Sequence, residues 1–274
     1  MKVFSSIILM LCTSVLVFAQ QPTPKVVLKK GDIIKISQDM LSKNKQSMMG
    51  GDPQEINTAV KSLTEVEVLE ELPQGYKVKK TLKSMKLDFE GFGQTTNYDS
   101  EKDKSSDNPF IKPITEKIGV PEVVEIGFDG KEKETGKDDK KGKGMMRMMG
   151  GGMSGGISSA FQLIPASAME SMGWEDTTEN DGLTTRRRYK IGGVLGSLAK
   201  LYIQAQTKGT LVMNQSGMGM STDVNVTSDE MILVNMETGR VQMQTINSKT
   251  NNKTTVNDKE SPSTGTTSVT IQIE

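Results

Sequence analysis

Residues 57–89 read NTAVKSLTEVEVLEELPQGYKVKKTLKSMKLDF, two alternating runs separated by a Leu-Pro-Gln-Gly turn. Val66 and Val68 alternate with charged residues in the first run, and Tyr76 and Val78 do so in the second. A period of two is typical of strands that bury one face. The Glu-rich first run leaves a helix open as an alternative, but the turn between the runs favours two antiparallel strands. We therefore predict one long antiparallel hairpin.

The same alternation recurs along the chain and predicts a mainly β fold. Further strand-like runs lie at 32–40, 123–128, 184–191, 198–213, 222–226, 231–234, 240–246 and 268–273. Short helices are predicted within 108–120 and, interrupted at Pro165, within 159–172. The Ser, Thr and Asn-rich residues 247–265 are predicted to form a loop. These elements predict one large curved antiparallel sheet, a half-barrel or a sandwich, with one or two short helices covering an opening.

The start of the chain predicts export. Lys2 precedes an apolar run, residues 3–18, which ends at Ala19. About 16 apolar residues are too few for a spanning helix, which needs roughly 20, so a signal peptide over residues 1–19 is favoured over a membrane anchor. The only cysteine, Cys12, lies in this segment. We predict a periplasmic or extracellular protein whose mature chain has no cysteine and no transmembrane segment.

The middle of the chain changes in composition. Residues 131–156 are almost entirely charged residues, glycine and methionine. Such a segment does not repay the entropy of ordering, so it is predicted to be a flexible loop. It would separate an N-terminal β-rich half, 20–130, from a C-terminal β-rich half, 157–274. The two halves are either similar to each other or alike only because every antiparallel sheet alternates.

Composition excludes several functions. The chain has no histidine, which excludes a Ser-His-Asp triad and a His-ligated zinc. Its 34 basic residues balance 34 acidic ones, which leaves no basic excess for binding nucleic acid. Carboxylates are abundant enough for a glycosidase-like pair, but the sequence singles none out. We predict that the protein is not an enzyme, uses no cofactor and binds no nucleic acid.

Methionines in the central segment are candidate ligand contacts. Met145, Met146, Met148 and Met149 lie among glycines. Thioethers are soft ligands for Cu(I), and they also make adaptable apolar contacts. Because methionines lie beside glycines elsewhere in the chain as well, a loop without a specific role is favoured over both. We predict no metal site.

Two aromatic residues are further candidates for ligand contact. Trp174 is the only tryptophan, and Tyr76 belongs to the predicted hairpin. Such side chains line lipid or sugar pockets, but aromatic residues make up only 4% of this chain. Scarce large residues of this kind are also the usual content of a core. Both readings stay open at the sequence level.

A compact basic cluster is the candidate site for a lipid headgroup or other anion. On a strand, Arg186, Arg188 and Lys190 would share one face, whereas Arg187 and Tyr189 would share the other. The alternative is a strand face that is simply solvated. For basic residues that alternate along a strand, a solvated face is the commoner outcome.

The order of three motifs resembles an uncharacterised family of secreted bacterial envelope proteins. The motifs are LKKGD at 28–32, MGW at 172–174 and NMETGR at 235–240. Members of that family have a Lys-x-Gly-Asp start, a Gly-Asp-x-Trp-like middle and an Asp-x-x-Thr-Gly-like end, which these motifs match in part. Gly173 and Trp174 have no acidic residue between them, and Asn235 stands where the family has Asp. The resemblance implies an envelope protein and transfers no catalytic residue.

These observations predict a noncatalytic binding protein. In the leading hypothesis, the concave apolar face of the sheet holds a lipid or other hydrophobic ligand. The alternative is a structural or protein-interaction module of the cell envelope without a small ligand, bound to another envelope protein. A carrier should have an apolar-lined cavity, whereas an interaction module should expose an apolar patch.

Overall fold

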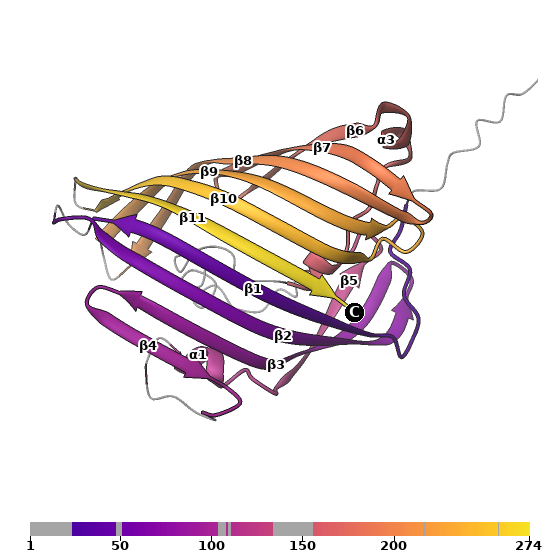
Figure 1. Ribbon diagram of the computed structural model, residues 1–274, viewed down its shortest axis with the longest axis horizontal. Helices are drawn as coiled ribbons and strands as arrows, with labels where there is room; N and C mark the ends of the chain where they lie inside the picture. The colour runs from indigo at the N-terminus through magenta and orange to yellow at the C-terminus, as the bar shows by residue number, and fades with distance from the viewer. Residues whose placement is uncertain are drawn as a thin grey trace, which may run out of the picture.

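The computed structural model describes residues 24–47, 51–103, 108, 111–133, 156–215, 218–256 and 258–274. Its strands form one 11-stranded antiparallel sheet (Figure 1). They are β1 (Ile33–Gln46), β2 (Gln54–Leu72), β3 (Gly75–Gly91), β4 (Gln94–Asp99), β5 (Pro121–Gly127), β6 (Gly173–Asn180), β7 (Leu183–Leu195), β8 (Leu198–Gln215), β9 (Met218–Asn235), β10 (Val241–Val256) and β11 (Lys259–Ile273). The helical segments are α1 (Lys112–Thr115), η1 (Ile157–Ala160) and α3 (Ala166–Ser171). The predicted fold class, one large antiparallel sheet with very little helix, is confirmed.

The first and last strands join the two halves of the chain. The strand order is β4-β3-β2-β1-β11-β10-β9-β8-β7-β6, and β5 pairs with β3 beside this path. β1 pairs with β11 from Ile36 opposite Ile273 to Gln46 opposite Ser263. The ranges predicted as two halves therefore contribute adjoining parts of one sheet. Among the described strands, β4 and β6 are the outermost and do not pair with each other, so the sheet is open.

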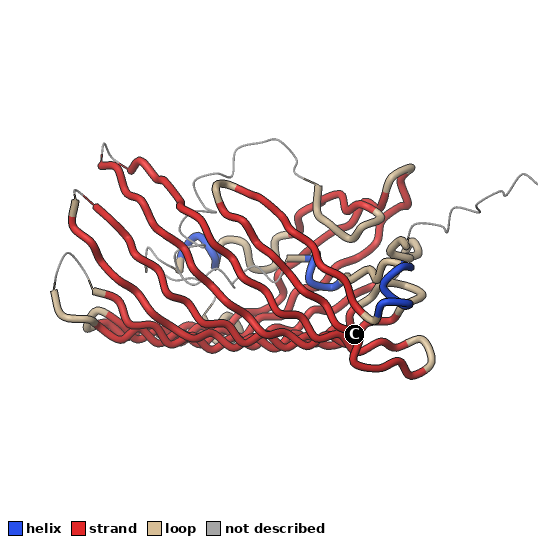
Figure 2. The backbone as a smooth tube through the Cα atoms, turned by 90° about the horizontal axis from the view of Figure 1, so that it is seen from above, coloured by secondary structure: helices blue, strands red, loops and turns tan. Residues whose placement is uncertain are grey.

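The sheet is bent into a trough whose inner side holds the helical segments (Figure 2). Burial alternates along β1, where Ile34, Ile36 and Met40 are buried while Ile33 and Leu41 are exposed. Successive side chains of a strand point to opposite faces, which explains this pattern. We call the face that carries Ile34, Ile36 and Met40 the concave face, and the opposite one the convex face.

The concave face packs into two hydrophobic clusters. The first cluster contains residues of β1, β2 and β3 and of the segments that cover these strands. The covering residues, from α1, β5, η1 and the chain next to them, include Ile111, Ile114, Val124, Ile126, Ile157 and Phe161. The second lies on β7 to β10, where Ala168 of α3 packs against residues such as Leu201 and Val234. Burying an aliphatic side chain contributes about 1.5–3 kcal/mol. The chain thus covers part of its own concave face.

The predicted hairpin is confirmed, whereas the predicted loop at 247–265 is wrong. β2 and β3 pair from Asn57 opposite Glu90 to Leu72 opposite Gly75. Residues 247–256 instead belong to β10 and residues 259–265 to β11, and the two strands pair with each other as far as Val256 opposite Lys259. Threonine suits a pleated surface, and strand neighbours can satisfy each other's hydroxyls. A composition typical of loops therefore does not exclude a strand.

The helix predicted within 108–120 is confirmed only for the single turn of α1. Gly119 has a φ of 77°, and its N–H donates to the Leu82 carbonyl at 2.8 Å. The chain therefore leaves the helix to run beside β3. The interruption predicted at Pro165 is confirmed, because this residue is the N-cap of α3.

Two predicted segments cannot be compared fully with the structure. The signal peptide, residues 1–19, lies outside the described residues, and so do all but the ends of the segment 131–156. Among the residues that are described, no helix is long and apolar enough to cross a membrane.

An ion pair joins the turn before β1 to the turn before β10. Arg240 Nη2 donates to Asp32 Oδ2, and the same oxygen accepts the Lys29 N–H at 3.0 Å. The Arg240 and Asp32 side chains are 33% and 27% exposed. These residues belong to the first and last motifs of the family resemblance. The contact therefore gives those motifs a structural role in connecting the two halves.

We predict that the ion pair of Asp32 and Arg240 contributes measurably to the stability of the protein. We expect Asp32→Asn to lower the free energy of unfolding by about 1–2 kcal/mol, because a charge-assisted hydrogen bond is lost where little water replaces it. The control is Asp39→Asn, whose carboxylate pairs with Lys61 at the exposed convex face. Because that pair is exposed to solvent, this variant should cost much less than Asp32→Asn. Urea unfolding measures both, and equal losses would contradict the assigned role of Asp32.

Candidate functional site

One line of concave-face residues crosses the sheet at the level of Met40. The strand registers place its members directly opposite one another, and all of them except Glu230 are apolar or aromatic. From β4 to β6 they are Tyr98, Leu87, Val60, Met40, Val269, Ile246, Glu230, Ile203, Tyr189 and Trp174. We call this line the apolar row. It gives ten consecutive strands one band that is apolar or aromatic except at Glu230.

The concave face becomes hydroxyl-rich on the next lines toward the β1–β2 turn. These lines, which we call the hydroxyl rows, carry Ser42, Thr58, Thr267, Ser248 and Ser228, followed by Asn44, Thr250, Thr207 and Thr185. Hydroxyls bond across strands, as Thr185 Oγ1 and Thr207 Oγ1 do at 2.9 Å. Most of these side chains are half-buried. The concave face is therefore amphipathic along its strands.

Aromatic and charged side chains meet on β6 and β7 where these rows adjoin. The rings of Trp174 and Tyr189 stack with centroids 4.2 Å apart. The Tyr189 hydroxyl donates to Asp176 Oδ2 at 2.9 Å. Arg187 Nη1 lies 3.6 Å from Asp176 Oδ1 and donates to Thr178 Oγ1 at 3.3 Å. An arginine thus faces the concave side, held by a carboxylate and a hydroxyl.

Burial raises the pKa of Tyr189 above its ordinary value of 10.0, and the hydrogen bond to Asp176 raises it further. A folded-state pKa above the unfolded one gives stabilisation that is complete below pH 10 and is lost as the pH rises through the folded pKa. We expect Tyr189→Phe to cost about 1 kcal/mol at neutral pH. The gap between wild type and variant should narrow above about pH 10. Urea unfolding across this range measures the gap, and a constant gap would contradict the prediction.

Glu230 is the one carboxylate in the apolar row, between Ile203 and Ile246. It accepts hydrogen bonds from Ser228 Oγ at 3.0 Å and from Gln244 Nε2 at 3.1 Å. Two neutral donors therefore satisfy its oxygens. Sequence reasoning missed this residue. The available signal was a charged residue at a strand position where the alternation calls for an apolar one.

The structure places the two aromatic candidates in different clusters. Tyr76 belongs to the first cluster, is 2% exposed, donates to the Val26 carbonyl at 3.0 Å and accepts the Leu28 N–H at 3.2 Å. A ligand would reach it only by displacing core residues. Trp174 is half-buried at the edge of the second cluster. The structure does not bring the two residues together, and a ligand contact by either stays a prediction.

The basic cluster divides between the two faces as its spacing predicts. Tyr189 is buried on the concave side, while Arg186, Arg188 and Lys190 are exposed on the convex side. Arg188 Nε lies 2.6 Å from Glu175 Oε1. A ligand on the concave face would therefore meet Arg187 rather than these three. Their contact with an anion stays a prediction that concerns the convex face.

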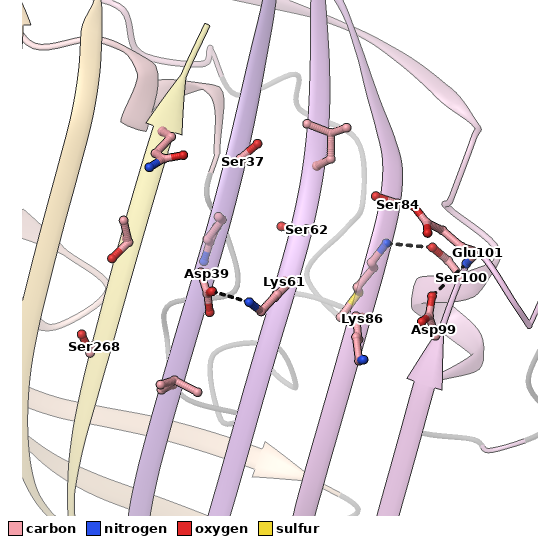
Figure 3. Close-up of a pocket in the computed structure, with 16 residues that line it drawn as sticks. Ser37, Asp39, Lys61, Ser62, Ser84, Lys86, Asp99, Ser100, Glu101 and Ser268 are labelled. Carbon is pink, nitrogen blue, oxygen red and sulfur yellow. Dashed lines mark hydrogen bonds and ion pairs between the residues drawn. The ribbon is translucent and has the colours of Figure 1, made fainter.

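An open groove of about 630 Å³ lies over β11, β1, β2 and β3, beside the turn after β4 (Figure 3). Many of its lining side chains are polar and belong to the convex face, such as Ser37, Ser84 and Ser268. Lys61 Nζ lies 2.8 Å from Asp39 Oδ2, and this hydrogen bond raises the pKa of Lys61. The groove is therefore lined mostly by polar side chains, some of which pair with each other. It is not an apolar pocket.

The described residues contain no metal-binding group. Nowhere in the described part of the chain are three or more Cys, Asp or Glu side chains grouped to hold a metal ion. The candidates Met145, Met146, Met148 and Met149 lie outside the described residues.

No family model matches the chain, and a comparison with curated proteins finds no match. Its fold is similar to part of the structure "Lipid-protein interactions in lipovitellin", at 10% identity, 90% coverage of this chain and a TM-score of 0.53. The chain spans 26% of the lipovitellin chain. An outer membrane channel from Pseudomonas putida F1 aligns at 7% identity over 93% of this chain and 99% of the channel, but its TM-score of 0.23 carries no argument. The likeness to lipovitellin concerns the fold alone.

Proposed function

We propose that this chain is an exported, noncatalytic binding protein whose concave face holds a lipid or other hydrophobic ligand. The observation that carries the proposal is the amphipathic concave face, where the largely buried apolar row crosses ten strands of one curved sheet and adjoins the half-buried residues of the hydroxyl rows. A mostly apolar concave surface with a few placed polar groups is the usual form of a ligand site.

The proposed ligand is amphipathic, because the concave face itself is. Its apolar part would lie where half-buried apolar residues interrupt the hydroxyl rows, among them Phe89, Ala205 and Val226. Its polar part would hydrogen-bond the Ser and Thr hydroxyls, and an anionic group would face Arg187. The deeper apolar surface is occupied by α1, η1 and neighbouring chain, so the ligand adds to this packing without replacing it.

The similarity to lipovitellin supports this proposal at the level of architecture. That structure concerns lipid–protein interactions, and the matched part shares the fold of this chain. At 10% identity the likeness transfers no residue. Lipid as the ligand is therefore our inference from the chemistry of the concave face.

Native mass spectrometry tests the proposal directly. The protein is purified gently from its own host, its intact mass is measured, and any bound molecule is extracted with solvent and identified. We expect a stoichiometric lipid or similar amphiphile. A mass equal to that of the polypeptide alone, unchanged after incubation with total lipid extract, would contradict ligand binding and favour the envelope interaction module.

A further inference from the structure

The convex face is polar over most of its area but apolar at one end. Elsewhere, exposed lysines pair with carboxylates across strands, as Lys61 does with Asp39 and Lys83 with Glu65. At the β7–β8 turn and the strands beside it, six apolar or aromatic side chains take the place of such pairs. They are Leu195, Leu198, Tyr202, Met231, Leu233 and Met243. We call these six residues the convex patch.

The strand registers show that the convex patch is continuous. Tyr202 lies between Lys190 on β7 and Met231 on β9. On the neighbouring line, Lys200 lies opposite Leu233, which itself adjoins Met243 of β10. Directly opposed side chains of one face contact each other. The patch is also accessible, because Leu195 is 83% and Tyr202 45% exposed.

The glycine beside Tyr202 helps to hold its ring on the convex face. A Cβ at Gly192 would collide with the Tyr202 ring, so the ring covers the bare backbone there. Lys200 Nζ lies 5.0 Å from the centroid of the same ring. The aromatic side chain and its cation are therefore placed together at the surface rather than folded into the core.

On β7 to β10, the only charged side chains on two lines of the convex patch are Lys190 and Lys200, while the convex-face carboxylate Asp229 of β9 lies on the next line. Among the described residues, neither lysine forms an ion pair, in contrast to Lys61 and Lys83. An apolar surface with unneutralised cations is complementary to an anionic amphiphilic surface.

We infer that the convex patch docks on the surface of a lipid bilayer that contains anionic lipids. Leu195, at the tip of the β7–β8 turn, enters the boundary between headgroups and acyl chains. Tyr202 lies at headgroup depth, where tyrosine is enriched, and the lysine stems extend along the apolar surface while their ammonium groups meet phosphate. This inference goes beyond ligand binding at the concave face and does not depend on it.

Flotation with vesicles tests the apolar part of the inference. The purified protein is mixed with vesicles of phosphatidylcholine and phosphatidylglycerol in a three-to-one ratio, and the floated fraction is measured against lipid concentration. We expect Leu195→Asp to weaken binding about tenfold or more, because a largely exposed leucine no longer enters the bilayer. The matched control is Leu41→Asp, at another exposed leucine of the convex face, outside the patch. It should bind like wild type.

The same assay tests the charge. We expect the double variant Lys190→Gln and Lys200→Gln to bind the anionic vesicles about tenfold more weakly, with little change on pure phosphatidylcholine. Lys43→Gln, on the exposed convex side of β1, is the control. A wild-type protein that floats with neither vesicle would overturn the inference. Equal flotation of Leu195→Asp and Leu41→Asp would also overturn it.

Discussion

Replacing Tyr76 with alanine is expected to lower the free energy of unfolding by about 4 kcal/mol, the largest stability effect that we predict for a single residue. Tyr76 is 2% exposed, and its ring meets Phe128 edge-on with centroids 5.5 Å apart. Its hydroxyl bonds the backbone of Val26 and Leu28. Truncation would leave a cavity in the first cluster and release the segment that leads into β1. Urea unfolding followed by circular dichroism measures the loss.

Tyr76→Phe separates the two contributions. It keeps the ring and removes the hydroxyl, so the Val26 carbonyl and the Leu28 N–H each lose a buried partner. We expect a loss of about 1–2 kcal/mol, well below that of the alanine variant. If the two variants were equally unstable, ring packing would contribute nothing, and the role of Tyr76 as a core residue would be wrong.

Placing a carboxylate on the concave face should weaken ligand binding strongly without unfolding the protein. Val226 is half-buried there, between Thr207 and Thr250. We expect Val226→Glu to weaken binding of a fluorescent long-chain fatty acid at least about tenfold, because the ligand would have to desolvate a charge. Fluorescence titration gives the Kd, and circular dichroism checks that the sheet is intact.

The neighbouring residue supplies the control. Thr227 is exposed on the convex face of the same strand, so Thr227→Glu adds the same charge one position away and should leave the Kd unchanged. Equal weakening by both variants would show that charge alone disturbs the probe. If both variants had the Kd of the wild type, the concave face would not be the binding site.

The strands with strict alternation were predictable because each buries one face. β1 and the middle of β7 follow that pattern, and it also divides Arg187 from Arg186 and Arg188. β9 was predicted as two short strands because polar residues between Val226 and Met231 hide its continuity. The structure makes it one strand, since both neighbours pair with it along this stretch.

The candidate site was less accessible to prediction than the strands. Trp174 was recognised for its rarity, but its stacking on Tyr189 depends on the register of β6 against β7. Glu230 and Gln244 meet because β9 lies beside β10 in that register. The convex patch likewise draws on residues of four strands, which only the pairing order of β7 to β10 brings together.

The amino-acid sequence by itself determined the mainly β class, most strand positions and the face on which most strand side chains lie. These properties follow from a local period of two, which each strand expresses without reference to its partners. Only the tertiary structure decided that β1 pairs with β11, that Asp32 meets Arg240, and that apolar residues form one row on the concave face and a patch on the convex face. Pairing order and register join residues far apart in the chain, and these contacts depend on packing the whole sheet at once.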